Sequence, residues 1–141
     1  MYKHEYYSSR REEFYVIFGR STTRMGRLLK KNYGHVCVIQ LKGNNTGVKL
    51  DPTPHGLETA MLDITKTLPL LINGGELSHK ILKVTNTRLN SFERTFQINS
   101  CISFVLYAMG LRYSWCFTPY QLYKRLLKES KGAGLWVEQI K

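Results

Sequence analysis

Four apolar residues at helical spacing place the strongest constraint on how this chain can fold. They are Ile102, Val105, Leu106 and Met109, which lie at positions i, i+3, i+4 and i+7 and therefore share one face of a helix. Gly110 follows and predicts the end of that helix. A helix that is apolar on one side must bury that side, so the pattern predicts a helix packed on another layer of structure.

Cys101 immediately precedes this apolar face, on the first turn of the predicted helix. Asn99 or Ser100 can cap the helix, which places free backbone N–H groups and the positive end of the helix dipole near the Cys101 sulfur. That environment favours the thiolate, the nucleophilic form of cysteine. A neighbouring imidazole would complete a Cys–His pair, and His35 opens an apolar strand upstream. The alternative is that Cys101 is a small buried apolar residue, as free cysteines commonly are.

Apolar runs and turn residues predict several strands. The predicted strands cover residues 14–18, 35–41, 48–51, 80–85 and 92–98. Pro52 and Pro54 are expected to end the third strand. Residues 68–72, which precede Asn-Gly-Gly, are expected to form a loop.

Two further helices complete the prediction. One begins with a hydroxyl cap within residues 21–23 and carries basic residues on its outer face. The last has Thr118 as its cap, Pro119 at the first helical position and Gln121 three residues after the cap, a capping-box pattern. The element order predicts an α+β fold, a small antiparallel sheet or open barrel with packed helices, in which the Cys101 helix lies beside the His35 strand.

Length and cysteine content bound the organisation of the chain. The 141 residues predict one domain, residues 13–141, preceded by a basic, tyrosine-rich arm over residues 1–12. Three cysteines make an odd number without paired spacing, which argues against a disulfide framework. No Cys/His cluster has zinc-ligand spacing, so neither a metal nor a cofactor is expected. The sequence shows neither a signal peptide nor a membrane span, which favours synthesis in a cytoplasm.

The net charge of +11 predicts attraction to an anionic partner. Nucleic acid, bound weakly and without sequence preference, a cell-wall polymer and an acidic protein all fit that charge. The alternative is a solvated basic face that keeps the protein soluble, because no zinc finger, RNP or GxxG motif accompanies the charge.

Several short segments resemble circularly permuted papain-like proteins of the NlpC/P60 superfamily, and small tailed-phage proteins of this type most of all. In that superfamily a serine-rich turn and helix lead into a strand that begins with the catalytic His, and the Cys follows at the start of a later helix. The resemblance covers about residues 14–51 and 97–128. The segments that carry it are Phe18-Gly19-Arg20-Ser21, Leu28-Leu29-Lys30, Tyr33-Gly34-His35-Val36-Cys37-Val38, Ser100-Cys101 and Thr118-Pro119-Tyr120-Gln121-Leu122-Tyr123.

The resemblance implies roles for particular residues. Cys101 corresponds to the nucleophile and His35 to its general base, and a third polar residue should orient the imidazole. Lys49 and Asp51 face the same way on the predicted third strand, and only Asp51 can accept a hydrogen bond from imidazole, with Gln40 as the alternative. His35 could instead be a core or edge histidine, and Asp51 an ordinary turn residue.

The remaining cysteines and histidines are not expected to take part in chemistry. Cys37 and Cys116 are flanked by apolar residues and are expected to be buried in the core. His55 and His79 are expected to lie on surface loops.

Two functions of different classes follow from the resemblance. The first is a cysteine hydrolase of amide or peptide bonds, directed at peptidoglycan peptides and carried in a phage virion. The second is a catalytically inert head or tail protein on the same fold. A nucleic-acid packaging accessory is a third interpretation that depends on the charge alone.

Overall fold

The computed structural model describes residues 11–20, 29–30, 32–43, 45–73, 80–87, 101–111, 116–129 and 134–140. Within these ranges the chain forms six strands and three helices. In chain order they are β1 (Glu12–Gly19), β2 (His35–Leu41), β3 (Thr46–Thr53), β4 (Gly56–Asp63), α1 (Ile64–Ile72), β5 (Lys80–Asn86), α2 (Cys101–Met109), α3 (Pro119–Glu129) and β6 (Leu135–Ile140).

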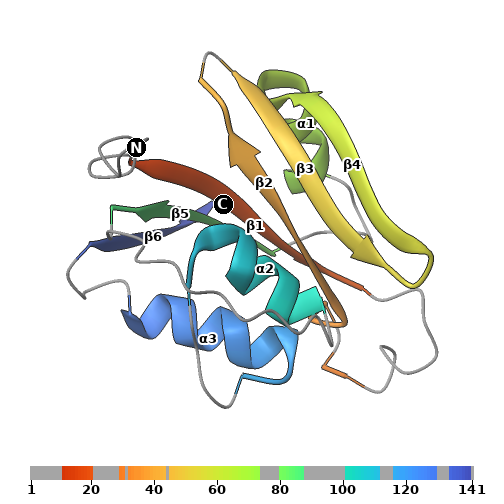
Figure 1. Ribbon diagram of the computed structural model, residues 1–141, viewed down its shortest axis with the longest axis vertical. Coiled ribbons are helices and arrows are strands. Elements are labelled where there is room, and N and C mark those ends of the chain that lie inside the picture. Colours follow the sequence, from red (N-terminus) through yellow and green to blue (C-terminus); the bar gives the residue numbers. More distant parts are fainter. Residues whose placement is uncertain are drawn as a thin grey trace, which may run out of the picture.

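All six strands belong to one open sheet in the order β4-β3-β2-β1-β5-β6 (Figure 1). Every neighbouring pair is antiparallel. The prediction of an α+β protein with an antiparallel sheet is therefore confirmed, and the sheet is open rather than closed into a barrel. The two outer strands are β4 and β6.

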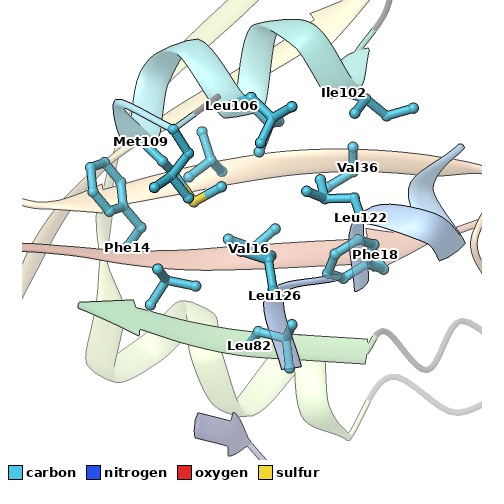
Figure 2. Packing of buried hydrophobic residues seen from close by; sticks show 14 of the residues in the cluster. Phe14, Val16, Phe18, Val36, Leu82, Ile102, Leu106, Met109, Leu122 and Leu126 are labelled. Carbon is cyan, nitrogen blue, oxygen red and sulfur yellow. The ribbon is translucent and has the colours of Figure 1, made fainter. Parts of the chain in front are cut away.

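The two faces of the sheet bury separate apolar clusters. On β1, Phe14, Val16 and Phe18 face α2 and α3, whereas Tyr15 and Ile17 face α1. Figure 2 shows the larger cluster, in which side chains of α2 and α3 pack against β1, β2 and β5. The apolar face predicted for the Cys101 helix is buried in this cluster, and Cys101 is the first residue of that helix that the structure describes.

The end of α2 and the start of α3 both match the sequence predictions. Gly110 adopts a positive φ of 72° directly after α2, a conformation that favours glycine and ends the helix. At the start of α3, the Gln121 backbone N–H donates to Thr118 Oγ1 at 3.2 Å, and Gln121 Oε1 accepts from the Thr118 N–H at 3.1 Å. The predicted capping box is therefore present.

Helix α1 corrects the expectation that residues 68–72 form a loop. It follows β4 without a break and includes Pro69, while Asp63 caps it by accepting the Thr65 N–H at 3.0 Å. Its first residue, Ile64, is buried over Gly47 of β3, where an added Cβ would lie 2.6 Å from Ile64 Cδ1 and 2.6 Å from Ile39 Cγ2. Glycine at this position therefore lets α1 pack directly against the β2–β3 pair.

Three strand predictions also need correction. Pro52 does not end β3 but pairs with Leu57 of β4, so the β3–β4 hairpin is longer than expected. Strands β4 and β6 were not predicted at all. The predicted helix after residues 21–23, the strand at 92–98, the cap at 99–100 and residues 1–10 of the arm lie outside the described residues. No helix in the described part of the chain has the length and apolar character needed to cross a membrane.

Candidate functional site

His35 is the first residue of β2 and lies at the end of the sheet where α2 begins (Figure 1). Its Nε2 and Asp51 Oδ1 are 2.6 Å apart, within hydrogen-bonding distance. The antiparallel register explains this proximity, since Leu50 pairs with Val38 and Asp51 follows toward the start of β2. The structure therefore places the proposed third residue on the imidazole, whereas Gln40 lies farther along β2 and pairs with Val48.

The Asp51 carboxylate is held from both sides. While Oδ1 contacts His35, Oδ2 is 3.2 Å from Lys49 Nζ. Only 14% of the Asp51 side chain is exposed, so this charge is partly removed from water. Burial alone would raise the pKa of Asp51, but the hydrogen bonds from His35 and Lys49 outweigh burial and lower it. Asp51 is therefore an anion at neutral pH and a fixed acceptor for His35.

Cys101 is the first residue of α2 and is half-buried. Its side chain interacts with the His35 imidazole closely enough to raise the pKa of that ring. Because Asp51 engages Nε2, Nδ1 is the ring nitrogen available to exchange a proton with the Cys101 sulfur.

The surroundings of His35 favour the imidazolium. The hydrogen bond to Asp51, followed by the one to Cys101, raises the pKa of His35 from 6.5 to about 9, although burial acts in the opposite direction. His35 is therefore protonated at neutral pH. The cationic ring thus adjoins both the Asp51 carboxylate and the Cys101 side chain.

The other cysteines and histidines have different environments. Cys37 is buried, which raises its pKa to about 12. Cys116 was expected in the core but is only half-buried, and burial still raises its pKa. His55 lies in an exposed turn, as predicted, and His79 lies outside the described residues. Of the three thiols, Cys101 is the one that contacts an imidazole.

A cavity of about 240 Å³ adjoins the His35–Asp51 pair on the face of the sheet that α1 covers. Its lining includes Lys49, and Leu71 of α1. Sequence reasoning did not anticipate either the cavity or the ion pair between Lys49 and Asp51. The signal for the ion pair was the two-residue spacing, which places both side chains on one face of β3.

Among the described residues, no group of three or more His, Cys, Asp or Glu side chains is placed to hold a metal ion. No protein-family model, curated protein or solved structure matches the chain. Function is therefore inferred from the geometry of the site itself.

Proposed function

We propose that this protein is a cysteine hydrolase of the permuted papain-like, NlpC/P60 type, acting on amide or peptide bonds. The observation that carries the proposal is the position of His35, which contacts Asp51 through Nε2 and also interacts with Cys101. A nucleophile, a base within hydrogen-bonding reach and a third group that orients the base form the arrangement required for nucleophilic catalysis. The start of α2 at Cys101 and the order His, Asp, Cys along the chain also agree with the permuted type.

The proposed reaction has two steps. The Cys101 thiolate attacks the carbonyl carbon, and as the tetrahedral intermediate collapses the C–N bond breaks while His35 gives its proton to the leaving amine. Neutral His35 then takes a proton from water as the water attacks the thioester. The C–S bond breaks, a carboxylic acid is released, and the Cys101 thiolate and the His35 imidazolium are restored. Asp51 stays ionised and holds the ring in position. The Cys101 backbone N–H is the proposed donor to the negative charge that develops on the carbonyl oxygen.

Reaction with an activated ester tests this proposal. The wild-type protein should release nitrophenol from p-nitrophenyl acetate over many turnovers, with a transient acetyl adduct on Cys101 detected by intact mass and peptide mapping. Cys101→Ala should abolish both signals, and His35→Ala should lower turnover by about 100-fold or more, the range expected for a lost general base. Asp51→Asn should have a smaller effect, because it acts through the orientation of His35.

Cys116→Ser is the matched control, since Cys116 is a half-buried thiol that is not hydrogen-bonded to His35. It should react as the wild type does. Equal turnover by wild type and Cys101→Ala would refute the proposed hydrolase.

Peptidoglycan peptides are the proposed substrate, and a phage virion the proposed location, both on the basis of the sequence resemblance. Purified cell-wall sacculi incubated with the protein should release new amino termini, and Cys101→Ala should release none. The net charge of +11 supports attraction to an anionic wall polymer, an acidic virion protein or nucleic acid. Binding that persists unchanged at high salt would contradict this electrostatic attraction.

A structural role in a phage head or tail is the second candidate, and the outer strand β4 favours it. Leu57 is 50% exposed and Met61 77% exposed on this strand, and an apolar strand at the edge of a sheet is suited to pairing with another chain. The structural role predicts association that Met61→Lys abolishes and Cys101→Ala leaves unchanged, measured by light scattering. A monomeric wild-type protein at high concentration, with no affinity for virion proteins, would exclude it.

A further inference from the structure

The cavity beside His35 has aliphatic walls. It lies between the sheet and α1 and has a volume of about 240 Å³. Ile39 of β2, Leu62 of β4 and Leu71 of α1 are among the residues that line it. Since a water molecule occupies roughly 30 Å³ in the liquid, the cavity has room for about eight non-hydrogen atoms. Apolar walls of this kind favour a hydrocarbon chain over a hydrated polar group.

The same cavity carries an excess of positive charge. Arg20, Lys49 and His35 line it, whereas Asp51 is the one acidic residue in its described lining. Lys49 and His35 share Asp51 as a partner, and His35 is protonated at neutral pH. One carboxylate cannot neutralise three cations, so an anionic group entering the cavity is attracted.

The cavity and the Cys101 thiol lie on opposite faces of the sheet. His35, Cys37 and Ile39 line the cavity, whereas Cys101 packs with the cluster formed by α2 and α3 and does not line it. A ligand in the cavity therefore contacts His35 from the α1 face of the sheet.

We propose that this cavity binds a short aliphatic carboxylate, with its hydrocarbon chain against Leu62 and Leu71 and its carboxylate toward Arg20 and Lys49. Binding of this carboxylate does not depend on the proposed hydrolase.

Binding is measured by methyl NMR titration of the Cys101→Ala protein, which cannot form an acyl intermediate. Hexanoate should shift the methyl signals of Ile39, Leu62 and Leu71 and bind at least about fivefold more tightly than hexanol or hexylammonium, which have the same chain length. Arg20→Met and Lys49→Met should each weaken the binding of hexanoate several-fold. Lys42→Met, at the opposite end of β2, removes the same charge outside the cavity and should leave binding unchanged.

Filling the cavity provides a second test. Leu71→Trp should abolish hexanoate binding, while Leu70→Trp should not, because Leu70 is 73% exposed and does not line the cavity. If Leu71→Trp does not fold, Leu71→Ala should instead shift the preference from hexanoate to octanoate. Equal affinity for hexanoate and hexanol, or binding that neither Leu71 variant alters, would overturn the proposal.

Failure of the two proposals gives different results. Hexanoate binding without ester turnover by the wild-type protein would refute the proposed hydrolase but support the proposed carboxylate site. Turnover at Cys101 without hexanoate binding would refute the proposed carboxylate site but support the proposed hydrolase.

Discussion

His35 Nε2 and Asp51 Oδ1 lie 2.6 Å apart across the β2–β3 hairpin, and this contact is the largest cause of the raised pKa of His35. Lys49 holds the second oxygen of the same carboxylate. The hairpin thus presents an oriented, protonated imidazole to the thiol at the start of α2.

The first prediction concerns the titration of His35. Its ring signals in NMR should titrate with a midpoint near the raised pKa of about 9, because the folded protein stabilises the imidazolium. Asp51→Asn removes the largest stabilising contact and should lower the midpoint toward the ordinary value of 6.5. A midpoint that Asp51→Asn leaves unchanged would show that Asp51 does not control the charge of His35.

The second prediction is a pH dependence of folding stability. Because the folded pKa of His35 is above its unfolded value of 6.5, its contribution is complete below that pH and is lost as the pH rises through about 9. The lowered pKa of Asp51 gives a contribution that is present above 3.8 and lost as the pH falls through the folded value.

Urea denaturation of wild type and Asp51→Asn at several pH values measures this dependence. The difference in free energy of unfolding should be largest between pH 3.8 and 6.5 and should shrink as the pH rises through about 9. A difference that grows between neutral and alkaline pH would contradict the linkage.

The third prediction concerns the reactivity of the thiols. At about pH 6, iodoacetamide should modify Cys101 before Cys37 and Cys116, because Cys101 interacts with the His35 imidazole while burial raises the pKa of the other two thiols. His35→Ala should slow the modification of Cys101 by about tenfold or more, as peptide mapping over time would measure. His55→Ala, in an exposed turn, is the control and should have no effect. Slower modification of Cys101 than of Cys37 or Cys116 would contradict the proposed hydrolase and favour the structural role in a phage head or tail.

The fourth prediction concerns the packing of α1 on β3. Gly47→Ala should lower the free energy of unfolding by about 1–3 kcal/mol, because the new Cβ would overlap the buried side chains of Ile39 and Ile64. Ile64→Val removes the Cδ1 atom that approaches within 2.6 Å and should recover part of the loss in the double variant. A double-mutant cycle of urea denaturation curves measures the coupling, and strict additivity would contradict direct contact.

Strong local patterns made parts of the fold predictable. The one-sided apolar face of α2 and the capping box of α3 each depend on residues within a few positions of one another. Strand β4 carries no such pattern, because it is an edge strand exposed along most of its length and its residues do not alternate. Helix α1 was missed because Pro69 and the following Asn-Gly-Gly are typical of loops, whereas contact with the sheet keeps this segment helical.

The site was predictable to a similar extent. Residue types and the two-residue period of β3 identified Asp51 as a partner for His35, and the structure brings Asp51 and Cys101 onto the imidazole. Their catalytic roles stay a prediction. The cavity could not be anticipated because it is formed by β1, β2, β3, β4 and α1 together, and its β4 and α1 walls come from elements that local patterns did not reveal.

The chain order of the site residues has a consequence for biosynthesis. His35 and Asp51 are 16 residues apart and meet within one hairpin, a local contact that costs little loop-closure entropy and forms early in folding. Cys101 is translated well after that hairpin and reaches the imidazole only when α2 docks on the sheet. A nascent chain therefore carries the imidazole–carboxylate pair before it carries Cys101, and the imidazole meets this thiol only in the completed fold.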